Sequence, residues 1–471
     1  MFGLLKENMI KTVMKNTLFF LMLSIGSLTL AQGDKSSCPG NLSIFAEFAK
    51  VKNYDSAYQP WKDVRTLCPE LNVATFKYGE RILAHKIKNA TDDKSVYQQE
   101  LIALYDDWIT YFPSTKRGVS EVGKILSSKA QAMVDYKLGT TQEAFDTFNQ
   151  AFTQDAASFT SPKRLYTFFK VSFQLYKEGG QTTEELFNKY EEISEKFELE
   201  QTNLARKLDV ILNKEDTGQP VTSREQRNKR VYETNVLAFS TYSSNLDAMI
   251  SKESSCENLI PLYRKNYEAN KTNSVWLNRA ASRMDAKECS DDPLFVELVE
   301  ALHGINPSAN SAYYLGLLKD KADDSQAALA YYEESLTLEQ DRYRKAAILY
   351  KIAVKFKTRG LKSKAHSYAR RALKNQPSMG KAYMLIASLY ASSANDCGTT
   401  QFEKRAVYWL AAKTARRAAS VDPGVKKTAL KMAASYEGRA PSKTDIFTEG
   451  NEGQTIRFSC WINDSVTVPQ L

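Results

Sequence analysis

Small and aromatic side chains recur in the C-terminal part of the chain in a pattern that repeats about every 34 residues. One copy begins at Ala309, a second begins at Ala346, and a third follows. In the first copy the small and aromatic members are Gly316, Ala328, Tyr332 and Ser335. Small residues at this spacing let two helices pack closely, and a proline such as Pro377 or Pro423 ends the second helix. The pattern predicts consecutive helix–turn–helix units over residues 309–440.

The N-terminal half shows the same pattern less clearly. Tyr54, Trp61 and Pro69 fit one unit, and further units extend to residue 212, so we expect divergent helical repeats over residues 32–212. Residues 213–230 are polar and contain Gly218 and Pro220, which predicts a linker. Degenerate repeats are expected over 231–308. The chain has only 20 glycines and 13 prolines in 471 residues, which favours helices over a β-sandwich or barrel.

The last segment, residues 441–471, has a different pattern. Between Gln454 and Val468, apolar and polar residues alternate on both sides of Asn463 and Asp464. Such alternation around a turn predicts a short β-hairpin. Because two strands alone are only marginally stable, we expect the hairpin to pack on the last helices. The alternative is a strand that is offered to a partner.

These repeats resemble the tetratricopeptide repeat (TPR), with a specific match over 310–436 and a moderate one over 42–200. The resemblance implies an all-α, TPR-like solenoid, here followed by the short β-hairpin, whose concave groove binds peptides or protein segments. It assigns to the groove one set of positions on the first helix of each repeat. Those residues are Asn310, Tyr313, Leu317, Tyr350, Val354, Lys357, Lys381 and Met384. The alternative for Tyr313 and Tyr350 is packing within the array.

The N-terminus has the features of a signal peptide. Lys11 and Lys15 precede an uncharged apolar run over residues 18–31, which is shorter than the roughly 20 residues that cross a bilayer. Small residues at the positions that signal peptidase reads predict cleavage after Ala31. A membrane anchor is the alternative for residues 1–31. No later segment is apolar enough to span a membrane, so we expect an exported protein in the periplasm or at the cell surface, of a type similar to Bacteroidota proteins.

Six cysteines follow the expected cleavage site. An even number of cysteines in an exported chain suggests disulfides, and six allow 15 pairings. Because a solenoid makes mostly neighbour contacts, we expect pairing in sequence order, with free buried thiols as the alternative. The candidate pairs are Cys38 with Cys68, Cys256 with Cys289, and Cys397 with Cys460.

Positive charge is concentrated in residues 341–440, which contain 22 Lys or Arg and five acidic residues. Its clusters are Arg370, Arg371, Lys374, Lys413, Arg416 and Arg417. A field of this sign attracts anionic partners, so an acidic protein or an anionic surface is a candidate partner, and an ordinary solvated face is the alternative. Export and the lack of a nucleic-acid-binding module argue against nucleic acid.

The sequence contains none of the common catalytic or cofactor motifs. It lacks a nucleophile elbow, a zinc-protease helix motif, a phosphate-binding glycine loop and a dinucleotide fingerprint. The three histidines are scattered, which weakens any multi-histidine metal site. We therefore expect no enzyme, cofactor or metal, and a scaffold that binds other cell-envelope proteins or peptide segments. The alternative is a glycan-binding or anionic-surface-binding helical protein, loosely similar to the starch-utilisation outer-membrane lipoproteins.

Overall fold

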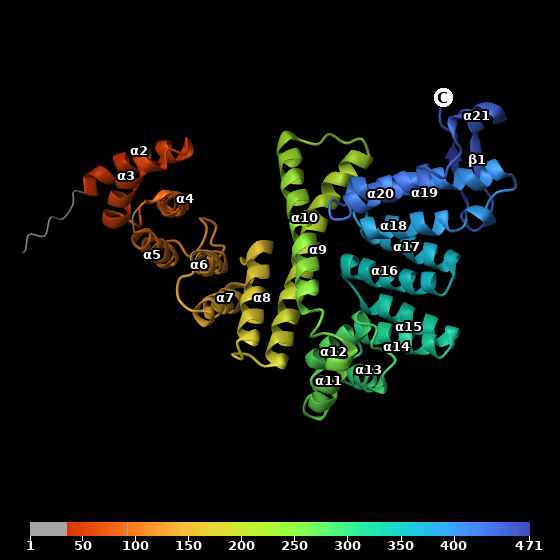
Figure 1. Ribbon diagram of the computed structural model, residues 1–471, viewed down its shortest axis with the longest axis horizontal. Helices are drawn as coiled ribbons and strands as arrows, with labels where there is room; N and C mark the ends of the chain where they lie inside the picture. The colour runs from red at the N-terminus through yellow and green to blue at the C-terminus, as the bar shows by residue number, and fades with distance from the viewer. Residues whose placement is uncertain (1–34, 92) are drawn as a thin grey trace, which may run out of the picture. The chain divides into compact units, whose positions relative to one another are not determined.

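The computed structural model describes residues 35–91 and 93–471, and the expected signal peptide lies outside them. The chain forms two compact units (Figure 1), which divide between Phe159 and Thr160. Each unit is described by itself. Within the described residues, no helix combines the length and the apolar composition needed to cross a membrane.

The first unit consists of helices that pack in consecutive pairs. Trp61 is fully buried in its core, and the indole Nε1 donates a hydrogen bond of 2.7 Å to the carbonyl oxygen of Thr75. Gly123 lets two helices approach closely, because a Cβ there would lie 2.0 Å from the carbonyl oxygen of Asp155. The elements are η1 (Lys35–Ser37), α2 (Cys38–Lys50), α3 (Tyr54–Leu67), α4 (Ala74–Asn89), α5 (Ser95–Tyr111), α6 (Val122–Tyr136) and α7 (Thr141–Asp155).

The second unit begins with three mutually packed helices and continues as an array of helix pairs, in which α14–α15, α16–α17 and α18–α19 stack in order (Figure 1). Its helices are α8 (Pro162–Lys177), α9 (Thr183–Asp216), α10 (Ser223–Ile250), α11 (Cys256–Asn270), α12 (Ser274–Ala286), α13 (Pro293–Ile305), α14 (Ala309–Lys321), α15 (Ser325–Leu338), α16 (Arg342–Thr358), α17 (Lys362–Asn375), α18 (Gly380–Ala391), α19 (Gln401–Val421), α20 (Lys426–Glu437) and α21 (Lys443–Glu449). A short helix η2 (Ala394–Asp396) and two strands, β1 (Thr455–Phe458) and β2 (Asp464–Thr467), complete it. We refer to α11–α20 as the array.

The small and aromatic residues of the repeat hold the helix pairs together as their spacing predicts. Gly316 on α14 faces the ring of Tyr332 on α15, and a Cβ at residue 316 would lie 2.5 Å from the ring atom Cδ1. Ser335 is also fully buried, and its hydroxyl donates a hydrogen bond of 2.6 Å to the carbonyl oxygen of Ala309. The array is therefore a TPR-like stack of helices, in agreement with the sequence.

Residues 213–230 differ from the expected linker. They contain the end of α9, a turn over 217–222 and the start of α10. The side chain and backbone of Thr222 pair with Glu225 in a capping box, which fixes the start of α10. Lys214 also forms an ion pair with Glu225 across the turn, at 2.6 Å. The polar segment thus contains the end of one long helix and the start of the next, and their charged side chains pair across the turn between them.

The C-terminal hairpin packs on the end of the array, but its turn differs from the expected Asn–Asp turn. The strands are joined by a five-residue loop over 459–463, since Phe458 pairs with Asp464. Two residues of this loop attach the hairpin to the array. Cys460 forms a disulfide with Cys397, and the Trp461 ring lies 6.0 Å from the ring of Tyr390.

The cysteines are paired in sequence order, as the sequence analysis predicts. Disulfides join Cys38 to Cys68, Cys256 to Cys289, and Cys397 to Cys460. The first connects α2 to the end of α3, and the second connects α11 to the turn before α13. All three therefore close short stretches of chain within one unit.

Candidate functional site

Three of the expected groove residues do not line an open groove. The side chains of Tyr313 and Leu317 are only 2% and 3% exposed. The Tyr313 ring packs between other aromatic rings, with its centroid 5.4 Å from that of Tyr314 and 6.0 Å from that of Tyr332. Asn310 is half-buried, and its amide donates a hydrogen bond of 3.0 Å to Asn278 Oδ1. The Tyr313 ring therefore packs within its own helix pair, and Asn310 contacts α12.

The expected groove residues on α16 and α18 are more accessible. Tyr350, Val354 and Met384 are half-buried, and Lys357 and Lys381 are exposed. Lys357 Nζ donates a hydrogen bond of 2.9 Å to Ser388 Oγ, and Lys381 Nζ lies 4.8 Å from the Tyr350 ring centroid. Met384 packs against the buried alanines of α19 and α20. This part of the surface therefore presents two lysines beside a partly exposed tyrosine.

The long helix α9 runs along the array and contacts it from α11 to α19. Two of its glutamates pair with arginines of α12, its last aspartate pairs with an arginine of α19, and its one arginine in the series pairs with the aspartate before α16. The ion pairs are Glu191 with Arg283, Glu195 with Arg279 at 2.8 Å, Arg206 with Asp341, and Asp216 with Arg417 at 2.5 Å. Of the residues that the sequence analysis assigned to a partner, Arg417 is thus paired with α9. We call the array residues in this contact the α9-facing surface: Arg279, Arg283, Asp341, Tyr343, Ser378, Arg417 and Val421.

Polar and apolar contacts near the end of α9 complete this interface. Asp209 accepts a hydrogen bond of 2.9 Å from the backbone N–H of Ser378, and loss of hydration raises the pKa of the Asp209 carboxyl above its usual range. Leu208 and Leu212 form a small buried cluster with Val421 at the end of α19. Because these two leucines are one helical turn apart, they place one face of α9 on α19.

At the other end of α9, the interface is tightly packed around Arg283. Arg283 is 4% exposed, and its guanidinium carbon lies 4.1 Å from the ring centroid of Tyr190. Burial lowers the pKa of Arg283 to about 10, so the side chain remains charged at neutral pH. Tyr190 also donates a hydrogen bond to Asp247 on α10. This arginine thus connects α12 to both long helices.

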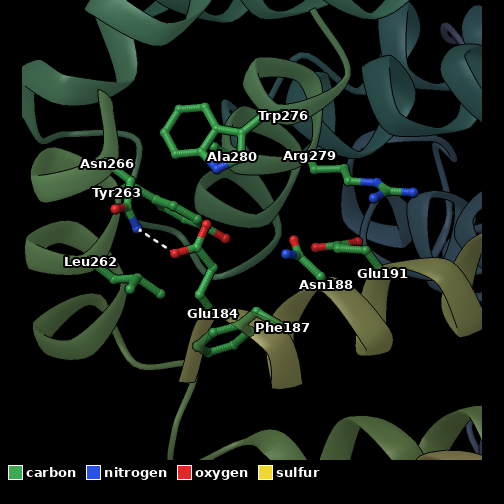
Figure 2. A pocket seen from close by; sticks show the side chains of 10 residues that line it. All are labelled: Glu184, Phe187, Asn188, Glu191, Leu262, Tyr263, Asn266, Trp276, Arg279 and Ala280. Atoms are coloured by element: carbon green, nitrogen blue, oxygen red, sulfur yellow. Dashed lines mark hydrogen bonds between the residues drawn. The ribbon is translucent and has the colours of Figure 1, made fainter. Parts of the chain in front are cut away.

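Figure 2 shows the pocket between α9 and helices α11 and α12 at this end. The amide of Asn266 donates a hydrogen bond of 3.2 Å to Glu184, and Trp276 lies across the pocket from Phe187. The space has a volume of about 20 Å³, which accommodates a water molecule and no larger ligand. It is therefore a small gap in the packing between helices and not a ligand-binding pocket. A second pocket, of about 130 Å³, lies between α9 and α10 and is lined in part by Glu198 and Asp247.

Charged groups of opposite sign face each other in the middle of the interface. Glu198 on α9, Lys351 on α16 and Lys381 on α18 are all exposed. The surrounding protein reduces their hydration, which raises the pKa of Glu198, and the two lysines partly oppose that rise. The same loss of hydration, together with Lys351, lowers the pKa of Lys381.

Half of the predicted basic clusters are engaged within the chain. Arg371 forms two hydrogen bonds with Glu333, of 2.6 and 2.9 Å, and Arg416 forms an ion pair with Glu437. Arg417 pairs with Asp216 of α9. The remaining predicted residues, Arg370, Lys374 and Lys413, are exposed. The array thus uses part of its positive charge to hold its own acidic segments. Within residues 35–91 and 93–471, no group of three or more His, Cys, Asp or Glu side chains is placed to hold a metal ion.

Comparison with known proteins adds to this picture. No family model matches the chain. Its sequence is 33% identical, over 107 residues, to the photosystem I assembly protein Ycf3 of Cyanophora paradoxa, and the match covers 21% of this chain and 62% of that protein. The match thus covers less than two thirds of the length of this curated relative.

Solved structures with helical repeats also match. A tetratricopeptide repeat protein from Parabacteroides merdae matches 66% of this chain and 97% of its own, with 11% identity and a TM-score of 0.27. Yeast Tom70 matches 88% of this chain and 83% of its own, with 11% identity and a TM-score of 0.25. The Cut9–Hcn1 hetero-tetramer of the APC/C matches with 11% identity and a TM-score of 0.29, over 83% of this chain and 95% of that chain. The chain's own consecutive helix pairs give the array its TPR-like fold.

The sequence analysis missed the role of α9. Glu191 and Glu195 lie about 90 residues before the arginines that they contact, and no local pattern connects the two segments. The available signal was the charge of the segments themselves, since α9 is rich in Glu and Asp and residues 341–440 are basic. The basic region was assigned an external acidic partner, although one acidic segment lies in the same chain.

Proposed function

We propose that this protein is a non-enzymatic scaffold of the cell envelope, which holds other proteins through its helical array. The α9-facing surface carries this proposal, because it binds a helical segment along its length by ion pairs and hydrogen bonds. A surface that binds a helical segment in this way is better suited to binding other protein segments than to catalysis on a small molecule. The related sequence is named as an assembly protein, in agreement with a scaffolding role.

Export is part of the same proposal. Three disulfides are favoured in an oxidising compartment such as the periplasm or the cell surface. Together with the apolar N-terminal run, they support secretion and cleavage after Ala31. Intact-mass measurement of the purified protein tests the cleavage site and the six oxidised cysteines together. A mass that includes residues 1–31, or six free thiols, would contradict export as proposed.

Crosslinking in living cells tests the scaffold proposal. A tagged full-length chain is crosslinked under mild conditions, and the recovered proteins are compared with those recovered by the tag alone. We expect specific envelope proteins, and we expect their recovery to fall when Arg279 and Arg417 of the α9-facing surface are both replaced by glutamate. The matched control replaces the exposed Lys426 and Lys427 of α20 in the same way and leaves recovery unchanged. Recovery of the same proteins with the tag alone would end the proposal.

A further inference from the structure

The helix α9 has two differently built sides. One side packs with α8 and α10 through aromatic rings. The ring centroid of Phe197 lies 5.2 Å from that of Phe239 on α10, and that of Tyr190 lies 5.6 Å from that of Phe169 on α8. The other side carries the carboxylates that reach the array. α9 is therefore anchored to α8 and α10 by aromatic packing, and to the array by ion pairs together with a small apolar cluster.

The contact with the array includes two partly exposed ion pairs, one with α12 and one with α19. Glu195 pairs with Arg279 by two hydrogen bonds, of 2.8 and 2.9 Å, and the Glu195 side chain is 52% exposed. Asp216 pairs with Arg417, and the two side chains are 46% and 36% exposed. Exposed ion pairs are individually weak and are screened by salt. In such a pair, a carboxylate of a competing ligand can take the place of the α9 carboxylate.

The covalent connection between α8–α10 and the array is short. α10 ends at Ile250 and α11 begins at Cys256, so the connecting segment is residues 251–255. The disulfide from Cys256 to Cys289 fastens the first array helix to its neighbours. Separation of α8–α10 from the array therefore requires no break in the backbone or in the disulfide of the array.

From these observations we propose that the α9-facing surface is a receptor for an acidic amphipathic helix, with α9 as its internal ligand. An external partner binds by presenting carboxylates in the same order and displacing α9. This inference rests on the proposed scaffold function and names the chemical class of its partner. Because α9 is tethered, its effective concentration at the surface is high, and a partner binds in proportion to the fraction of molecules in which α9 is released.

A labelled peptide of residues 183–216, added to the full-length chain, tests the proposal by fluorescence anisotropy. In the loosened variant, Glu195→Gln and Asp216→Asn remove two carboxylates that face the array. We expect the peptide to bind this variant roughly threefold to thirtyfold more tightly than it binds the unaltered chain, the range given by two partly exposed ion pairs. Equal binding to both chains, or no binding to either, overturns the proposal.

The matched control changes the same charge on the same helix away from the array. Glu200 pairs with Lys196 within α9, and Glu215 pairs with Lys229 on α10. Replacing Glu200 and Glu215 by glutamine leaves peptide binding at the level of the unaltered chain. Binding that rises as much in the control as in the loosened variant also overturns the proposal.

A charge exchange keeps the test valid if the loosened variant folds poorly. Arg279→Glu and Arg417→Glu reverse the charge of the receptor surface, and a peptide with lysine at 195 and 216 matches it. We expect this peptide, and not the native one, to bind the reversed chain. Circular dichroism spectra verify that each variant is folded. Binding of both peptides equally shows that charge order is not read and refutes the inference.

The outcome is separable from that of the proposed function. Peptide binding to the loosened variant without recovery of any envelope protein supports the receptor surface and contradicts the scaffold. Recovery of envelope proteins to the same extent by the loosened and the unaltered chains supports the scaffold and contradicts the competition with α9.

Discussion

Replacing Gly316 by alanine tests whether the small residues of the repeat set the helix spacing in the array. Gly316 lies in α14, and a Cβ there would lie 2.5 Å from Cδ1 and 2.6 Å from Cε1 of Tyr332. Ordinary carbon–carbon contacts are about 3.5–4.0 Å, so the added methyl group overlaps the ring by about 1 Å. Tyr332 is only 1% exposed, and its ring also packs against Tyr313 and Phe356. The ring therefore has no free space into which it can move.

The expected cost follows from two opposing contributions. Overpacking a well-filled core costs about 1–3 kcal/mol. Removing a glycine from a helix contributes about 0.5–1 kcal/mol of stability in the opposite direction. We expect Gly316→Ala to lower the free energy of unfolding by about 1–2 kcal/mol. For a unit of about 300 residues, this lowers Tm by about 2–3 °C.

Gly304 provides the matched control. It lies in α13, and a Cβ there would meet no atom within 4 Å. We expect Gly304→Ala to leave stability unchanged or raise it by up to about 1 kcal/mol. Both variants are measured by urea unfolding with circular dichroism and by amide hydrogen exchange of α14 and α15. If Gly316→Ala is as stable as Gly304→Ala, the close approach of the two helices does not hold the pair. Tyr332→Leu in the Gly316→Ala background should restore part of the loss.

Three further predictions concern other parts of the chain. Replacing Cys397 and Cys460 by serine opens a 63-residue loop, worth up to about 4 kcal/mol in the chain-entropy model, and we expect trypsin then to cleave after Arg457 in β1, whereas the intact hairpin resists. Burial lowers the pKa of His366 to about 4, so the unfolded state binds more protons than the folded state between pH 4 and 6.5. The free energy of unfolding should therefore be constant above pH 6.5 and fall by up to about 2 kcal/mol towards pH 4. A urea midpoint that is no more pH-dependent than that of His366→Gln would contradict this. Gly123→Ala should cost the first unit about 3 kcal/mol or more through the clash described above, so limited proteolysis should degrade residues 35–159 and spare 160–471; equal resistance of both regions would show that the glycine is dispensable.

The sequence predicted those features that depend on neighbours along the chain. Gly316, Tyr332 and Ser335 occupy positions whose spacing alone indicates a helix pair, and the structure packs them accordingly. The sequence-ordered disulfides followed from the same reasoning, since each pair lies within one or two repeats. The hairpin was expected, but its loop was not, because the alternation continues through Cys460 and Trp461 although both side chains turn towards the array.

Features that depend on distant segments were not predictable in the same way. Tyr313 occupies a groove position in the repeat pattern, but it is buried by Tyr314 and Tyr332. The polar composition of 213–230 indicated a linker because composition does not reveal charge pairing across a turn. One signal was available there, since Thr222 and Glu225 have the spacing of a capping box and mark the start of a helix.

The disulfide between Cys397 and Cys460 also determines how the chain responds to mechanical tension. A force applied to the two ends passes through the sulfur–sulfur bond and bypasses the 63 residues between them. At about 3.3–3.6 Å per extended residue, this withholds roughly 200 Å of contour length from stretching. Helices α19, α20 and α21 lie inside that bypass. The last helices of the array therefore remain folded under a pull that unravels the repeats before them.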